Sequence, residues 1–449
     1  MLNLRLSLIA SGLLAICFFL SSSCSAEPEV AKQTGASDFE QFFSEGLKAF
    51  SEGKAILGEK LLKETLKLEA KQGASDTKKA QSLTILADYY RSQKRLAESE
   101  ALYKQALAKL ETSKDSDAAS ALPGVLSKLA SLFKAQEKYD EAEALIKRAL
   151  VIASKQSGAE SAEAATVQAN LGLLYQKMGK SKEAEAQELN AIRIFQTKLG
   201  VESLEVAQCN SDLATQYMNE HKIPKAIPLL ESALAIFEKK APGKLVYATC
   251  ADQLGTAYFA EGKYAQAEDL ARKALSIYQK LLGPQNMEVA IALSNLGYRL
   301  AKQDKNQEAL DCFSKSIAIQ EKAMGQASPD ILANYHGMAE VYVSQADFKK
   351  TESVLRQALA LREKIWGTQH VALVPALRNL GNCLILEGAS PDEPEMLFAR
   401  ADAIITQLPE EKRKKMDAVF AQDLVKGLEL SKKKGKKEKT EKKDKDAIW

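Results

Sequence analysis

The chain has 449 residues, of which 46% are apolar and only 6% aromatic, so alanine and leucine must supply most of its core. Its 62 basic and 59 acidic residues leave a net charge of +3, which by itself indicates no charged partner such as nucleic acid. The charge is unevenly distributed, because residues 432–446 hold nine lysines and four acids, whereas residues 27–431 are mildly acidic.

Residues 1–26 have the pattern of a signal peptide for export from a bacterial cytoplasm. Arg5 supplies the positive start, and the uncharged apolar run LSLIASGLLAICFFL follows it. The small residues Cys-Ser-Ala at 24–26 suit ordinary cleavage, whereas LSSSC ending at Cys24 resembles a lipobox, from which Ser21 departs. We therefore expect a periplasmic or secreted protein, and a lipoprotein anchored through Cys24 or an uncleaved anchor remain alternatives.

After a linker at residues 27–40, one pattern recurs through residues 41–405. It reads Leu, then Ala or Gly (here called the anchor), an aromatic residue or Leu three positions on, and Ala twelve and nineteen positions on. Successive anchors lie 41 to 43 residues apart. They are Ala87, Ala130, Gly172, Ala214, Gly255, Gly297, Ala339 and Gly381. Such a period predicts a stack of supersecondary units, each unable to bury its apolar face alone.

Residues 249–282 show what one unit contains. The anchor Gly255 and Tyr258 share a face of one predicted helix, and Ala267 lies on the inward face of a second. Gly262 separates the two helices, so the unit is a helical hairpin. Small residues at the anchor and at Ala267 indicate that the two helices cross closely. The same phasing predicts that the first clear hairpin has helices near 79–93 and 96–112.

These residues resemble tetratricopeptide repeats, and the long period resembles the kinesin-light-chain type of 42-residue repeat. LGPQNMEVAIALSNLG at 282–297 and WGTQHVALVPALRNLG at 366–381 carry the resemblance. It implies an all-α, right-handed superhelical solenoid of about nine helical hairpins. It also implies that the first helices line a concave groove that binds a protein or peptide without catalysis.

The two ends of the array depart from the pattern. Residues 43–68 keep the phase but lack the aromatic, so we interpret them as a degenerate first repeat, and Glu393 replaces an expected Ala in the last. Residues 406–431 carry one apolar stripe and predict a capping helix, with a partner-binding amphipathic helix as the alternative. The stripe consists of Met416, Val419, Phe420, Leu424 and Leu428.

The Lys-rich segment at 432–449 has little to bury and is expected to be a disordered tail. It either solubilises the protein or contacts anionic lipid headgroups, wall polymers or nucleic acid.

Residues that could carry catalysis are scarce. The three histidines share no metal-ligand spacing, and neither a Cys-x-x-Cys pair nor a phosphate-binding glycine loop occurs. We therefore expect no enzyme activity, metal or cofactor, and keep an enzyme using His336 near Glu340 as a remote alternative. Cys209 and Cys250 occupy equivalent sites in adjacent repeats, about 10 Å apart, which is too far for a disulfide.

The candidate peptide groove follows from the phase of the first helices. Polar residues recur two and three positions before the anchor, and in the middle repeats apolar residues stand one or four positions after it. Amide side chains at such positions can bind an extended peptide backbone, and apolar ones can hold its side chains, although the same pattern also suits a simply solvated face. The candidate residues are Asn170, Asp212, Met218, Gln253, Phe259, Asn295, Tyr298, His336, Arg378 and Asn379.

The sequence thus predicts a non-catalytic protein-interaction scaffold or peptide-binding protein outside the cytoplasm. The alternative is an envelope-associated structural lipoprotein. Arg378 with Asn382 resembles half of the carboxylate clamp by which some relatives hold chaperone tails, but no later repeat supplies the other half. We expect a protein or peptide partner, no specific nucleic acid, and membrane attachment only if Cys24 is lipidated. The oligomeric state stays open.

Overall fold

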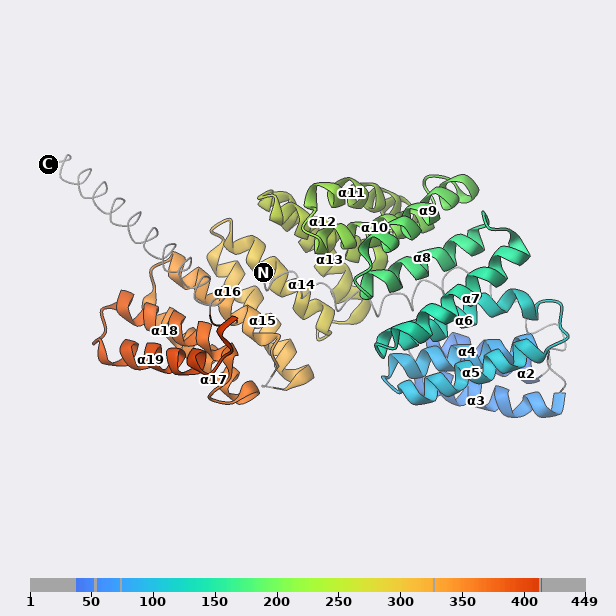
Figure 1. Cartoon of the computed structure of the whole chain (residues 1–449), viewed down its shortest axis with the longest axis horizontal. Coiled ribbons are helices and arrows are strands. Elements are labelled where there is room, and N and C mark those ends of the chain that lie inside the picture. The colour runs from blue at the N-terminus through green and yellow to red at the C-terminus, as the bar shows by residue number, and fades with distance from the viewer. Residues whose placement is uncertain (1–37, 52–54, 73–74, 326–327, 412, 414–449) are drawn as a thin grey trace. The chain divides into compact units, whose positions relative to one another are not determined.

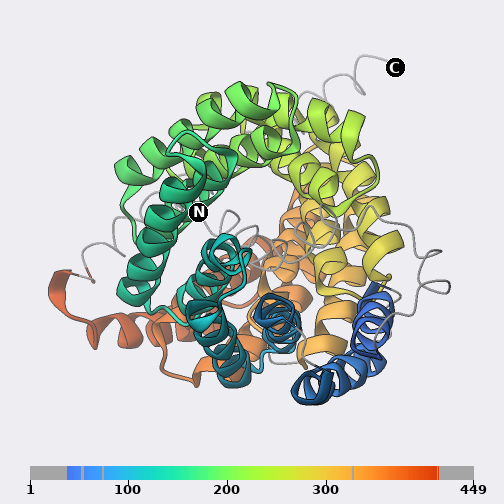
Figure 2. The same ribbon diagram turned by 90° about the vertical axis from the view of Figure 1, so that its right-hand side faces the viewer.

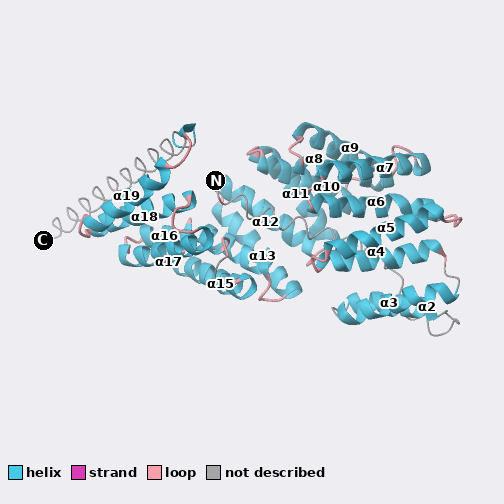
Figure 3. Ribbon diagram, turned by 60° about the horizontal axis from the view of Figure 1, so that its bottom comes forward, coloured by secondary structure: helices cyan, strands magenta, loops and turns pink. Residues whose placement is uncertain are grey.

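The computed structural model describes residues 38–51, 55–72, 75–325, 328–411 and 413, and within these ranges every regular element is a helix (Figure 3). The predicted all-α fold is therefore confirmed. The signal peptide with Cys24, most of the predicted capping helix and the Lys-rich tail lie outside the described residues. No helix of the described ranges is both long enough and apolar enough to cross a membrane.

The chain divides into two compact units, and each is described by itself. Unit 1 extends to Gln303 and unit 2 begins at Asp304. The helices of unit 1 are α2 (Asp38–Ser51), α3 (Ala55–Gln72), α4 (Asp76–Ser92), α5 (Leu96–Thr112), α6 (Ala118–Ala135), α7 (Tyr139–Ser157), α8 (Ala162–Lys177), α9 (Ser181–Leu199), α10 (Leu204–Asn219), α11 (Ile223–Lys240), α12 (Leu245–Ala260), α13 (Tyr264–Leu282) and α14 (Met287–Ala301). The helices of unit 2 are α15 (Asn306–Met324), α16 (Ile331–Ser344), α17 (Phe348–Trp366), the short 3₁₀ helix η2 (Val371–Leu373), α18 (Val374–Glu387) and α19 (Asp392–Thr406).

Consecutive helices pair as antiparallel hairpins, from α2 with α3 to α12 with α13 in unit 1, and α16 with α17 and α18 with α19 in unit 2 (Figure 1). The helices α4 and α5 match the predicted spans 79–93 and 96–112 within three residues, which confirms the phasing by the anchor. The degenerate first repeat also forms a hairpin, α2 with α3. Its missing aromatic is replaced by Phe50, whose ring lies 2.9 Å from the position that a Cβ on Gly58 would take.

The close crossing of the two helices in a hairpin is confirmed at the middle repeats. A Cβ added to Gly255 would lie 3.2 Å from the backbone oxygen of Ala267, which is itself completely buried. At Gly172 a Cβ would lie 2.7 Å from the side chain of Glu188 on the facing helix. The anchors are therefore small because the facing helix leaves little or no room for a larger side chain.

From α4/α5 onward, each hairpin that lies within one unit turns through a residue with positive φ, seven positions after its anchor. Glycine occupies this left-handed position in three repeats, as in Gly262 at φ 78°. Other residue types adopt it elsewhere, among them His221 at φ 59°. Left-handed backbone costs such residues about 1–2 kcal/mol, so these turns are held by the packing of the helices on either side.

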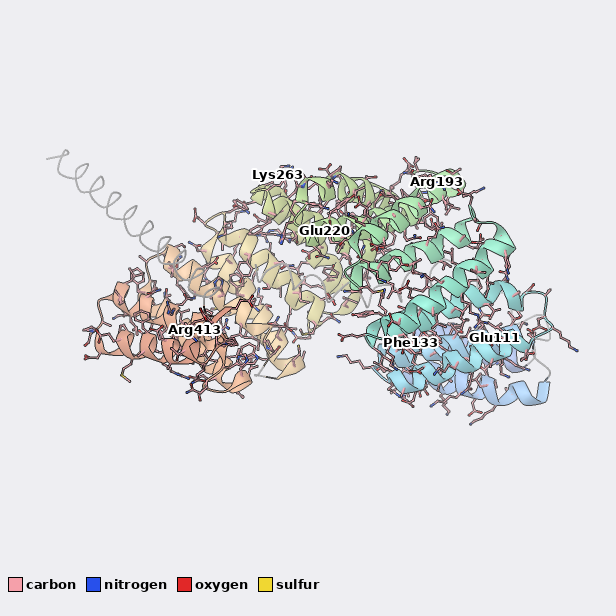
Figure 4. All side chains as sticks on the ribbon, in the orientation of Figure 1. Glu111, Phe133, Arg193, Glu220, Lys263 and Arg413 are labelled. Atoms are coloured by element: carbon pink, nitrogen blue, oxygen red, sulfur yellow. The ribbon has the colours of Figure 1, made fainter. Side chains whose placement is uncertain are left out.

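Hairpins stack because the second helix of each contacts the first helix of the next (Figures 1 and 2). A tyrosine at the end of the first helix reinforces this contact. Tyr175 donates to Glu143 of the preceding hairpin at 3.1 Å, and the ammonium of Lys180 lies 5.2 Å from the centre of the tyrosine ring. The arrangement recurs at neighbouring turns, where for example Lys263, labelled at the top of the ribbon in Figure 4, lies over the ring of Tyr258.

The first helices of successive hairpins in unit 1 also touch one another. Contacts run from α4 to α6, α8, α10, α12 and α14 in turn. We call the surface that these six helices form the first-helix face.

Candidate functional site

The first-helix face carries seven of the ten predicted site residues. They are Asn170 on α8, Asp212 and Met218 on α10, Gln253 and Phe259 on α12, and Asn295 and Tyr298 on α14. The remaining three lie in unit 2.

The three apolar candidates are not equally accessible. Met218 is 4% exposed and Tyr298 is 7% exposed, so both belong to the interior of unit 1. Phe259 is half-buried, and its ring centre lies 5.4 Å from that of Tyr264. Of the predicted apolar patch, Phe259 is therefore the side chain that a ligand could contact without rearrangement.

The polar candidate Gln253 is hydrogen-bonded to side chains of the preceding repeat. The hydroxyl of Ser211 on α10 donates to Gln253 Oε1 at 2.6 Å, and Gln253 Nε2 donates to the hydroxyl of Thr215 at 2.8 Å. Both bonds join α10 to α12. The amide of Gln253 is therefore already used in holding two repeats together, which lowers its capacity to bind a ligand.

A stronger link joins α12 to α14. Arg299 is 2% exposed, and its guanidinium donates to Asp252 Oδ1 at 3.0 Å and to Thr256 at 2.9 Å. Asn295 Nδ2 donates to the other carboxylate oxygen of Asp252 at 3.2 Å. A buried guanidinium needs such a complete set of acceptors, because an unpaired buried charge is very costly.

Two of these bonds follow one rule. The residue three positions before an anchor pairs with the residue two positions before the next anchor: Ser211 with Gln253, and Asp252 with Asn295. At the start of the array the link is different, since Lys128 on α6 pairs with Asp88 on α4 at 2.6 Å. The predicted row of polar side chains thus exists, and much of it connects consecutive first helices.

A carboxyl group lies behind the face between α8 and α10. Glu188 on α9 is 1% exposed; its Oε1 accepts from Gln176 Nε2 at 2.5 Å, while its Oε2 is buried without a partner. Burial, together with the nearby Asp212 carboxylate, raises the pKa of Glu188 to about 9. Glu188 is therefore a neutral carboxylic acid at neutral pH. Sequence reasoning missed it, because a glutamate in an amphipathic helix normally indicates the solvated side.

The candidates in unit 2 are more exposed. Arg378 pairs with Asp402 at 2.7 Å, and Asn379 is exposed beside it. His336 and Glu340 lie one helical turn apart on α16, with Nδ1 3.4 Å from Oε1 and both side chains largely in solvent. This pair lacks the enclosure that an acid–base site needs. In the described residues no group of His, Cys, Asp or Glu side chains could hold a metal ion.

The stacked hairpins and the continuous first-helix face define a helical-repeat solenoid, a class of protein that presents an extended surface to its partners. Two models of the tetratricopeptide repeat match the chain, one over residues 122–197, 204–280 and 247–322 and the other over residues 80–112. The chain belongs to the tetratricopeptide repeat family. No curated protein matches its sequence.

Two solved structures with the same fold are similar over most of the chain, and a third is similar over less than half of it. The signal transduction ATPase PH0952 from Pyrococcus horikoshii, which has a tetratricopeptide repeat sensor, is 12% identical, with a TM-score of 0.59 over 86% of this chain and 55% of that one. The apo form of the quorum sensor NprR from B. thuringiensis is 14% identical, with a TM-score of 0.53 over 82% of this chain and 99% of that one. A putative kinesin light chain from Podosopora anserina with TPR-like repeats is 23% identical, with a TM-score of 0.42 over 46% and 100%.

Proposed function

We propose that the chain is a non-catalytic interaction protein that holds an extended segment of a partner protein on the first-helix face of unit 1. The observation that supports this is the continuity of the face, since each first helix contacts the next from α4 to α14. A surface of regularly repeated geometry suits a ligand that is itself extended, because one short backbone segment can lie on each repeat. NprR and PH0952, which share the fold, are both described as sensors.

The proposed place of action is outside a bacterial cytoplasm. This part rests on the sequence of residues 1–26. Cleavage after Ala26 would release the protein into the periplasm or the medium. Lipidation of Cys24 would instead hold it at a membrane, where the lysines of residues 432–446 could approach anionic headgroups. That second form is the envelope-associated structural lipoprotein.

Affinity capture of the full chain from fractionated cells tests the function, with the cytoplasmic fraction as the comparison. We expect a protein partner to be captured from the envelope or the medium, in an amount comparable with that of the chain itself. Recovery of the chain only from the cytoplasm, with residues 1–26 intact, contradicts export, and capture without any protein partner contradicts the interaction. Metabolic labelling with a fatty-acid probe, in the wild type and in Cys24→Ser, separates the lipoprotein from the freely exported form.

A further inference from the structure

The links between first helices are interrupted at one place in unit 1. Side-chain hydrogen bonds or ion pairs join α4 to α6, α8 to α10, α10 to α12, and α12 to α14. Within the described residues no such bond joins α6 to α8, although the two helices are in contact. Polar side chains between α6 and α8 are therefore available to hydrogen-bond a ligand.

The pairing rule shows which groups these are. By position, Ser127 on α6 should pair with Asn170 on α8, as Ser211 pairs with Gln253. Instead the Ser127 hydroxyl is buried without a partner, and the half-buried amide of Asn170 makes no side-chain hydrogen bond within the described residues. A buried hydroxyl without a partner carries a desolvation cost that a ligand can remove.

Between α8 and α10, the next pair of first helices, the carboxylate of Asp212 is incompletely paired. The rule would pair Asp212 on α10 with residue 169, which is Ala169 and offers no side-chain donor. The carboxylate accepts from Gln208 on its own helix at 3.0 Å. Burial raises the pKa of Asp212 to about 7, against the opposing effects of Gln208 and of Lys134.

Lys134 carries a positive charge near Asp212. It lies half-buried on α6, and no carboxylate oxygen of the described residues lies within 4.0 Å of its ammonium. Burial lowers the pKa of Lys134 to about 8, and Lys177 and Arg91 add to this effect, whereas Asp212 opposes it. Two partly desolvated charges of opposite sign thus attract each other across α8 without forming an ion pair.

We infer that α6, α8 and α10 form the ligand-binding subsite of the first-helix face, an inference that rests on the proposed function. The subsite takes an extended peptide segment that carries one acidic and one basic side chain. The acidic side chain pairs with Lys134 and the basic one with Asp212. Between them Asn170 hydrogen-bonds the peptide backbone. The contacts to Lys134 and Asn170 supply side-chain partners that the free protein lacks, and the contact to Asp212 adds a cation to the hydrogen bond from Gln208.

Charge argues against peptides of a single sign. A purely acidic segment would place negative charge against Asp212, and a purely basic one would approach Lys134, Lys177 and Arg91. Glu188 adds no further negative charge while it remains protonated behind the face. The subsite therefore selects a mixed sequence by repulsion as well as by attraction.

Synthetic peptides test the ligand class. Fluorescein-labelled glycine–serine peptides carry either one aspartate and one lysine at varied separation, two aspartates, or two lysines, and their binding to the full chain is followed by anisotropy. We expect the best mixed peptide to bind about tenfold more tightly than either single-sign peptide. Lys134→Gln and Asp212→Asn should remove this advantage, while the matched surface variant Lys239→Gln should keep it. Equal affinity for all three peptides overturns the inference.

A photocrosslinking residue separates failure of the subsite from failure of the proposed function. It is placed in the full chain at position 177 on α8, or at position 189 on the outer helix α9, in cells that produce the protein. Capture of a partner from position 177 alone, reduced about tenfold by Lys134→Gln and by Asp212→Asn, supports both. Capture from position 177 that neither variant changes overturns the subsite and leaves the proposed function standing. Capture only from position 189 overturns both. Circular dichroism of each variant confirms that its helices are intact.

Discussion

Replacing the buried carboxyl group of Glu188 by an amide should make the protein more stable at neutral pH. Glu188 is 1% exposed, and its pKa is raised from the ordinary 4.5 to about 9, chiefly by burial. Between these two values the folded chain keeps a proton that the unfolded chain has lost. The contribution of Glu188 to the free energy of unfolding is therefore fully present below about pH 4.5, and it is lost progressively as the pH rises towards 9.

The magnitude follows from the pH interval. One proton corresponds to about 1.4 kcal/mol for each pH unit, and pH 7 lies about 2.5 units above the ordinary pKa, so the cost at pH 7 is about 3 kcal/mol. Glu188→Gln avoids this cost. It has nearly the same shape, its oxygen still accepts from Gln176, and its amide occupies the place of the unpartnered Oε2.

Urea unfolding of the full chain, followed by far-ultraviolet circular dichroism at several pH values, measures the difference. The transition midpoint of Glu188→Gln should equal that of the wild type near pH 4.5 and exceed it increasingly up to about pH 9. Glu183→Gln, at an exposed position of the same helix, is the matched control and should show no such trend. A difference between Glu188→Gln and the wild type that is constant across this pH range would refute the neutral buried acid.

Three further predictions concern the packing of the repeats. Gly255→Leu should lower the melting temperature by overpacking α12 against α13, at a cost of about 1–3 kcal/mol or more, and an unchanged melting curve would exclude the close crossing. His221→Gly should raise stability by about 0.5–1 kcal/mol by relieving left-handed backbone, whereas Gly262→Ala at the equivalent turn should lower it, and the two urea midpoints must move in opposite directions. Cys209 and Cys250 are both buried as free thiols and should stay reduced, so intact masses with and without reductant should show no two-proton loss at this pair.

The architecture could be predicted from the sequence because its determinants are local and repeated. Each anchor and its companion Ala lie within one hairpin, so the phase of a single repeat fixes which helices cross and where the turn falls. The replacement of a missing aromatic by Phe50 was not predictable in this way, because it lies one position away from the pattern.

The polar side chains of the first-helix face were predicted only in part, because their hydrogen bonds join residues about 40 positions apart in the sequence. The sequence placed Gln253 on the correct helix, but the hydrogen bonds that its amide makes depend on Ser211 and Thr215 of the preceding repeat. Met218 was expected on the surface and is buried. Glu188 was missed altogether, since no local pattern distinguishes a buried glutamate from a solvated one on an outer helix.

The proposed partner lies on the first-helix face of unit 1. Lysine-directed crosslinking of the captured complex, with mass spectrometry of the linked peptides, tests it without changing the protein. We expect links from the partner to Lys134 and Lys177 on the first helices, and few to Lys147 or Lys198 on the second helices. Links to Lys147 and Lys198, with none to Lys134 or Lys177, would contradict it.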